Sequence, residues 1–229
     1  MNSYIWIEPR GVAQAAKEAA APGSVLKAGG VDVLDHLKEG LWRPERLVNL
    51  SRLPALRESR ELPAEGDLPA RLRLGAGLTL GQLAADEALR RRFPALCAAA
   101  EGAATPQIRA LATLGGNLLQ RPRCWYYRSL DHECKKKGGP VCFAQDGQSE
   151  FHAILDNRVC AMVHPSAAAT ALLALDAVVV VQGAAGERRL PIAGLFQSPS
   201  EQAADVRREH TLAEGEVLAA VELPIAGGD

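Results

Sequence analysis

Four cysteines gathered in one stretch are the side chains best suited to chemistry in this chain. Cys124, Cys134, Cys142 and Cys160 are separated by nine, seven and seventeen residues. This spacing differs from the C-x2-C pattern of common zinc ribbons and bacterial ferredoxins, so spacing alone leaves the metal open. Five cysteines in 229 residues, most of them in one stretch, also do not suit the disulfide framework of a small secreted domain.

The residues around these cysteines favour iron and sulfur. A cubane held by four thiolates carries net negative charge, which nearby cations would offset. Six basic residues lie close in sequence, opposed up to Cys142 only by Asp131 and Glu133: Arg121, Arg123, Arg128, Lys135, Lys136 and Lys137. We therefore predict a [4Fe-4S] cluster; structural zinc and a solvated basic loop with incidental thiols are the alternatives.

Three other candidate ligands are left outside this site. His132 and His152 flank the cysteines, but a single histidine in a polar loop is more often a surface or hydrogen-bonding residue. Cys97 lies in an alanine-rich segment, where a thiol usually serves as a small core side chain. We assign chemistry to none of them.

Two glycine loops are the next candidates for ligand binding. Residues 28–32, AGGVD, stand between a predicted strand and a predicted helix, where backbone N–H groups can bind a phosphate. Residues 113–117, TLGGN, add a hydroxyl and a carboxamide. Each loop could be an ordinary turn, but the pair suits a large cofactor held at two places. Gly75, Gly77 and Gly81 do not have the G-x-G-x-x-G spacing of a Rossmann fold.

The hydrophobic pattern predicts an α+β fold. Residues 4–9, 24–30 and 46–50 read as strands and residues 12–21 and 31–40 as helices, which suggests a small α/β lobe over residues 1–54. Residues 55–70 are charged and contain proline, which suits a surface connection between lobes.

A larger lobe is predicted over residues 55–229. It begins with a strand at 71–77, a helix at 80–92 and an alanine-rich helix at 94–104. A capping box at Thr79 opens the first of these helices. Further along the chain we predict a helix near 169–177 and strands near 178–183, 188–192 and 216–224. Hairpin-linked strands with helices on one side indicate a mainly antiparallel sheet.

The composition excludes several classes of function. With 26 Lys and Arg against 27 Asp and Glu, no overall charge attracts nucleic acid or an anionic membrane. No apolar run is long enough to span a membrane, and the N-terminus has no export signal. No Ser-His-Asp or Cys-His arrangement stands out, so we predict no catalytic residue, no nucleic-acid partner and no membrane insertion.

The chain resembles the FAD-binding subunits of the xanthine dehydrogenase and carbon monoxide dehydrogenase family of molybdenum hydroxylases. The resemblance runs through KAGGVDVLDHLKEG, TPQIRALATLGGNLLQRPRCWYY and HPSAAATALLALDAVVVV and covers almost the whole chain. Residues 120–165 resemble the insertion that carries a [4Fe-4S] cluster in the FAD subunits of periplasmic aldehyde oxidoreductase and 4-hydroxybenzoyl-CoA reductase.

The resemblance implies a two-lobed FAD-binding fold of the PCMH type and assigns its site residues. FAD would be lined by Lys27, Ala28, Gly29, Gly30, Val31, Asp32 and Val33, and by Thr113, Gly115, Gly116, Asn117 and Gln120. The cluster ligands would be Cys124, Cys134, Cys142 and Cys160.

Two positions depart from the family pattern. The family commonly has a polar residue where this chain has Val31, and an aspartate after Ser166 where this chain has Ala167. Each lost hydrogen bond costs on the order of 1 kcal/mol, so FAD affinity would fall roughly ten- to thirty-fold.

The resemblance also implies partners. A molybdenum-cofactor large subunit would transform the substrate, a [2Fe-2S] small subunit would relay electrons, and this chain would carry the flavin step. It would be cytoplasmic, or periplasmic if exported with a signal-bearing partner. The family continues into a C-terminal domain that we expect to be absent, because the sequence ends at Asp229. Two alternatives are a non-catalytic assembly subunit that keeps the cluster but has lost FAD, and a stand-alone flavin oxidoreductase.

Overall fold

A parallel sheet forms the N-terminal part of the molecule. The computed structural model describes residues 3–66, 68–200 and 205–225. Strands β1 (Ile5–Ile7), β2 (Ser24–Lys27) and β3 (Arg46–Asn49) are ordered β1-β3-β2, and both pairs are parallel. Helices α1 (Val12–Ala19) and α2 (Val31–Lys38) make the two connections, because parallel strands need a crossover.

The second sheet is antiparallel throughout. It contains β4 (Ser59–Leu62), β5 (Arg71–Gly75), β6 (Val178–Gly183), β7 (Gly186–Pro191) and β8 (Val217–Pro224), ordered β4-β5-β8-β6-β7. The central strand β8 is buried over seven of its eight residues. The prediction of an α+β fold with a mainly antiparallel sheet is confirmed.

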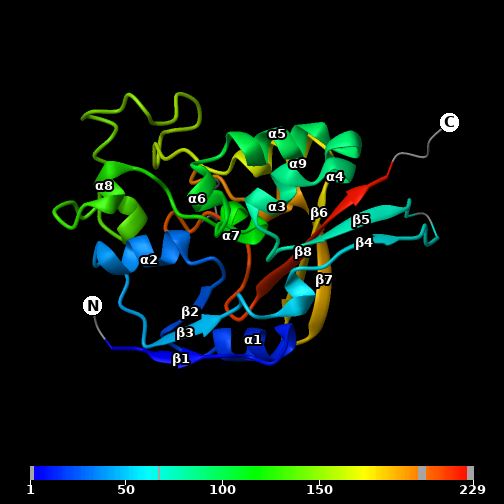
Figure 1. Ribbon diagram of the computed structural model, residues 1–229. Coiled ribbons are helices and arrows are strands. Elements are labelled where there is room, and N and C mark those ends of the chain that lie inside the picture. Colours follow the sequence, from blue (N-terminus) through cyan, green and yellow to red (C-terminus); the bar gives the residue numbers. More distant parts are fainter. Residues whose placement is uncertain (1–2, 67, 201–204, 226–229) are drawn as a thin grey trace.

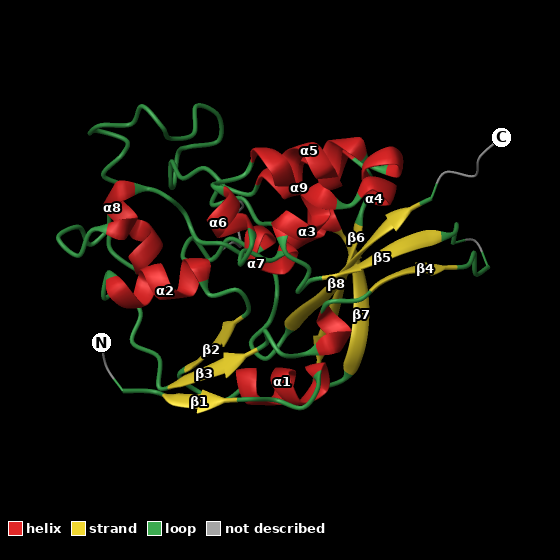
Figure 2. Ribbon diagram, viewed as in Figure 1, coloured by secondary structure: helices red, strands yellow, loops and turns green. Residues whose placement is uncertain are grey.

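Helices cover one face of this sheet (Figures 1 and 2). They are α3 (Leu80–Ala85), α4 (Glu87–Arg92), α5 (Pro94–Gly102) and α9 (Ala167–Ala174), with α6 (Pro106–Arg109) and α7 (Leu114–Leu118) nearby. Leu96 of α5 and Leu172 of α9 are fully buried in one core with Val179 and Val221 of the sheet. Burying one such side chain is worth about 1.5–3 kcal/mol.

Helix α1 joins the two sheets. Its Ala15 and Ala16 are buried in one apolar cluster with Val48 of β3 and with Val217 and Ala219 of β8. Small side chains on α1 allow this close approach. The division at residues 54 and 55 stays a prediction, because this shared core spans it.

One local prediction was wrong, and one strand was missed. The helix expected at 80–92 is two helices: Asp86 adopts an extended conformation (φ −78°, ψ 106°), and its carboxylate accepts a hydrogen bond from Leu89 N at 2.9 Å, which starts α4. Aspartate is favoured at the N-cap of a helix, where its carboxylate accepts a hydrogen bond from a free backbone N–H, and it is less favoured in a helix interior. Residues 55–70 were expected to be a surface connection; most of them are exposed, but the strand β4 within them, which pairs with β5, was missed.

The cysteine segment, residues 120–165, contains little regular structure. It holds α8 (Trp125–Arg128) and a short 3-10 helix, Lys135–Lys137. In Figure 1 it lies beside α2, and Tyr127 of α8 bonds His36 of α2 with 3.0 Å between Oη and Nε2. The segment therefore packs against the N-terminal part of the chain.

Candidate cofactor-binding site

A cavity of about 990 Å³ lies between the two sheets. Its walls come from the loop after β2, from residues 110–120, and from residues 205–218 leading into β8. The volume is at the upper end of the range for ligand pockets, about 300–1,000 Å³. All twelve residues predicted to contact the cofactor line it: Lys27, Ala28, Gly29, Gly30, Val31, Asp32, Val33, Thr113, Gly115, Gly116, Asn117 and Gln120.

The first glycine loop needs glycine for steric reasons. Gly30 has φ +87° at the start of α2, a backbone conformation that favours glycine. A Cβ at Gly29 would lie 1.9 Å from Leu111 O, so glycine lets this loop touch the opposite wall. The first N–H groups of α2 have no partner within the helix, and Val31 and Asp32 line the cavity. The loop can therefore offer backbone donors to a phosphate.

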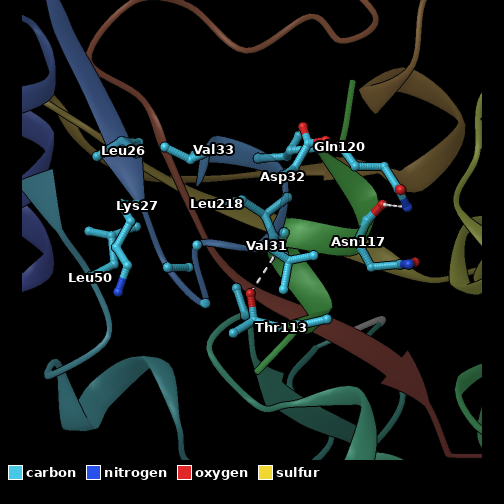
Figure 3. Close-up of a pocket in the computed structure, with 18 of the residues that line it drawn as sticks. Leu26, Lys27, Val31, Asp32, Val33, Leu50, Thr113, Asn117, Gln120 and Leu218 are labelled. Atoms are coloured by element: carbon cyan, nitrogen blue, oxygen red, sulfur yellow. Dashed lines mark hydrogen bonds between the residues drawn. The ribbon is translucent and has the colours of Figure 1, made fainter. Parts of the chain in front are cut away.

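The second glycine loop starts α7. The Thr113 hydroxyl caps this helix by accepting from Gly116 N at 3.1 Å. Asn117 Oδ1 accepts from Ser166 Oγ at 2.6 Å, and Gln120 Nε2 donates to Asn117 O at 3.0 Å. Figure 3 shows Asn117 and Gln120 across the cavity from Lys27, with Val31 between them. These hydrogen bonds fix the polar side chains of this wall.

Asp32 lines the cavity, but its carboxylate binds the cysteine segment. Oδ2 accepts from Arg121 N at 3.0 Å, and Oδ1 accepts from Arg128 Nη2 at 2.8 Å. Both bonds cross between segments far apart in the sequence, so sequence reasoning could not find them. A contact between Asp32 and pyrophosphate stays a prediction.

Sequence reasoning did not identify residues 205–218 as part of the cavity, because no motif marks them. Asp205, Arg208, His210 and Leu218 from this segment line the cavity. Burial, with Arg208 and Arg121 nearby, lowers the pKa of His210 to about 4, and its Nδ1 has no hydrogen-bond partner among the described residues. His210 is therefore neutral at pH 7.

Lys27 brings a cation to the same cavity. Its Nζ donates to Asn49 Oδ1 at 3.5 Å and lies 5.6 Å from the centroid of the Trp6 ring. Desolvation by burial lowers the pKa of Lys27, partly opposed by the charge of Glu8. An ammonium group in this position can attract a phosphate.

The four predicted cluster ligands line a second, small cavity. Cys124, Cys134, Cys142 and Cys160 are all free thiols around a space of about 10 Å³, enough for about one water molecule. Cys124 accepts backbone hydrogen bonds from Tyr127 and Tyr126, and Cys160 accepts one from Met162.

Burial disfavours ionisation of two of these thiols, Cys124 and Cys160. It raises the pKa of Cys160 to about 11 and raises that of Cys124. Ala161 N also donates to Cys142 Sγ at 3.5 Å. Backbone donors to sulfur are the interactions that stabilise a thiolate. For Cys124 and Cys160 the backbone donors thus oppose part of the effect of burial on the pKa.

The two histidines left outside the site differ in position. His152 lines the cysteine cavity, and its Nε2 lies 3.1 Å from Cys124 Sγ. His132 packs edge-on against Tyr126 and Phe143. The exclusion of His152 from the ligand set stays a prediction; its contact with Cys124 arises because the chain folds back between residues 124 and 152.

Three of the six basic residues near the cysteines, Arg121, Arg128 and Lys136, pair with carboxylates. Lys136 Nζ lies 3.0 Å from Glu209 Oε1, and Arg128 Nη1 lies 3.1 Å from Glu39 Oε2. Asp131 and Glu133 are the acidic residues between the basic ones in the sequence, and the fold adds carboxylates from other segments, Glu39 and Glu209. Within the described ranges, no three His, Cys, Asp or Glu side chains are placed to hold a single metal ion.

A large cavity with a glycine loop on each of two walls defines a protein that binds an extended, phosphate-bearing cofactor. The model of the FAD-binding domain in molybdopterin dehydrogenases matches residues 2–226. The chain therefore belongs to this family of FAD-binding oxidoreductase subunits. The family prediction is confirmed. No helix in the described part of the chain is long and apolar enough to cross a membrane.

Three relatives show the extent of the likeness. The aldehyde oxidoreductase FAD-binding subunit PaoB of Escherichia coli K12 is 34% identical over 227 residues, 98% of this chain and 69% of PaoB. The xanthine dehydrogenase FAD-binding subunit of Escherichia coli O157:H7 is 42% identical over 97 residues, 42% of this chain and 32% of that subunit.

A solved chain of carbon monoxide dehydrogenase from Hydrogenophaga pseudoflava has a TM-score of 0.66 at 22% identity, covering 99% of this chain and 60% of that chain. At this identity the likeness shows the fold alone. The chain spans less than two thirds of this solved relative.

Proposed function

We propose that this chain is an electron-transfer subunit that binds FAD and a [4Fe-4S] cluster. One observation carries the proposal: the residues predicted to contact FAD share one large cavity, and the four predicted ligand cysteines share a second cavity nearby. Gln120 and Arg123 line the first cavity and Cys124 lines the second. One short piece of chain therefore reaches both sites.

The chain's own groups would position FAD rather than react. The backbone around Gly29 and Gly30 would bind the pyrophosphate, and residues 113–117 would hold the phosphate and flavin side. When bound, FAD supplies the redox chemistry and the protein supplies orientation and electrostatics. No acid, base or nucleophile is required of this chain.

Two features support a metal centre held by the four thiols, which we propose to be the [4Fe-4S] cluster. Four thiols line one cavity, and backbone N–H groups donate to three of them, Cys124, Cys142 and Cys160. Lys136 lines the same cavity, where its charge is already paired with Glu209.

A second candidate is an assembly subunit that keeps the cluster without FAD. It is favoured by two apolar side chains, Val31 and Ala167, which both line the large cavity where the family commonly offers polar groups. Their apolar character removes two hydrogen bonds without filling the cavity. We expect weakened FAD binding rather than none.

The partners proposed are a molybdenum-cofactor subunit and a [2Fe-2S] subunit. The relatives are named as FAD-binding subunits of aldehyde oxidoreductase and xanthine dehydrogenase, which supports assembly with other chains. The substrate would be transformed on the molybdenum partner. We propose a cytoplasmic location, or a periplasmic one if a partner carries the export signal.

Analysis of iron, acid-labile sulfide, zinc and flavin in anaerobically purified protein tests the proposal. About four irons and one FAD per chain are expected for the two cofactors. Iron without FAD would favour the assembly subunit. Zinc without iron would refute the cluster.

A further inference from the structure

Arg121 lies between the FAD cavity and the cysteine cavity. Its backbone N donates to Asp32 Oδ2 at 3.0 Å, and its Nη1 donates to Glu209 Oε2 at 2.8 Å. Asp32 belongs to one wall of the FAD cavity, and Glu209 stands between Arg208 and His210 of another wall. Arg121 thus joins two walls of the cavity without lining it.

The same residues extend to the cysteine side. Glu209 Oε1 also lies 3.0 Å from Nζ of Lys136, which lines the cysteine cavity. Arg121 Nε donates to Tyr127 Oη at 3.0 Å, and Tyr127 lines that cavity too. We call the connected residues Asp32, Arg121, Arg128, Lys136 and Glu209 the ionic brace.

The ionic brace is buried, which makes it stiff. The side chains of Glu209 and Lys136 are 1% and 2% exposed, and those of Arg121 and Arg128 are 18% and 13% exposed. A charge buried without its partner is strongly unfavourable. If the cysteine segment shifts, its cations must therefore either carry Asp32 and Glu209 along or leave them unpaired.

We propose that the ionic brace couples the two sites, so that the state of the cysteine segment sets the affinity of the cavity for FAD. The proposal rests on the proposed function for the identity of the two ligands. With the cysteine site loaded, the brace holds the α2 wall and the 205–210 wall in their binding positions. Such coupling is reciprocal, and couplings of this kind change affinity by about 5- to 150-fold.

The first test needs no substitution. The dissociation constant for FAD is measured by flavin fluorescence on the iron-loaded protein and on the same protein after its iron is removed by oxidation and chelation. We expect FAD to bind roughly tenfold more weakly after removal. Equal dissociation constants would overturn the coupling while leaving both cofactor assignments intact.

The second test alters the brace outside the FAD cavity. Glu209→Gln preserves the shape of the side chain but removes the charge that faces Lys136 and Arg121. Glu101→Gln is the matched control, because Glu101 pairs at the surface with Arg90. We expect Glu209→Gln to weaken FAD binding and to abolish most of its dependence on iron. The control should match the unaltered protein.

A third variant guards against misfolding of Glu209→Gln. Arg128→Met removes the 2.8 Å contact with Asp32 and leaves Glu209 and its two cations in place. It should also weaken FAD binding; an affinity equal to that of the unaltered protein would overturn the proposal. If the purified protein holds no iron, the cluster assignment fails, and these two variants still test the brace. If FAD binds neither to the unaltered protein nor to any variant, the assignment of FAD as the cofactor fails instead.

Discussion

Substituting Gly29 with alanine tests the geometry of the cofactor cavity. The new Cβ would lie 1.9 Å from the carbonyl oxygen of Leu111 and 2.8 Å from its carbonyl carbon. Both are backbone atoms, so no side-chain rotation can relieve the clash. Either the first glycine loop, residues 28–32, or residues 110–113 must move, and both segments line the FAD cavity.

The cost can be divided between folding and binding. Overpacking a closely fitted site typically costs about 1–3 kcal/mol of stability. Displacing the loop also removes hydrogen bonds to the phosphates, each worth about 1 kcal/mol, which corresponds to roughly a five- to tenfold weaker affinity for FAD. We therefore expect Gly29→Ala to lower both the unfolding free energy and FAD affinity.

Two measurements check this prediction. Urea unfolding gives the stability, and flavin fluorescence gives the dissociation constant for FAD. Gly102→Ala is the control, because a Cβ at Gly102, at the end of α5, meets no atom within 4 Å. If Gly29→Ala binds FAD as tightly as the control, the close contact of the two loops does not shape the site.

Three further predictions concern single side chains. Val31→Thr adds a hydroxyl to the cavity wall and should strengthen FAD binding about fivefold, measured by fluorescence titration; no change would place the phosphate elsewhere. The Cys134→Ser variant should contain less iron than the unaltered protein when iron is assayed after purification. Cys97→Ser is the control and should keep its iron, because Cys97 lies outside the cysteine cavity and its thiol donates to Leu83 O at 3.2 Å. Equal iron contents in the two variants would contradict the ligand set. Because the pKa of His210 is lowered from 6.5 to about 4 in the folded protein, the unfolded state takes up its proton first as pH falls. Stability should therefore drop by about 2–3 kcal/mol between pH 7 and pH 4.5. Urea unfolding should show a smaller drop in His210→Gln, and an identical drop would refute this origin.

The elements that the sequence predicted well have strong local signals. The alternation of strands and helices over the first fifty residues matches β1 to β3 with α1 and α2, and the capping box at Thr79 is present. The long helix at 80–92 failed because hydrophobic spacing continued through Asp86, while the extended backbone of that residue ended one helix and began another.

The site was only partly predictable for a different reason. The two glycine loops and the four cysteines stand out by residue type, and the resemblance to the family extended the glycine loops to the twelve residues expected to contact FAD, all of which line the cavity. Glu209 and His210 could not be named in advance, because their environment comes from chain far away in sequence, and the contact of His152 with Cys124 was hidden for the same reason. Asp32 shows both cases: its place beside the cavity followed from the AGGVD loop, but its partners Arg121 and Arg128 followed only from the fold.

The central claim, two redox centres in one chain, is tested most directly by an anaerobic reductive titration. The protein is titrated with dithionite while flavin absorbance and the low-temperature electron paramagnetic resonance spectrum are followed. The account predicts uptake of about three electrons per chain, two by FAD and one by the cluster. Uptake of about two, with flavin bleaching and no iron-sulfur signal, would contradict it.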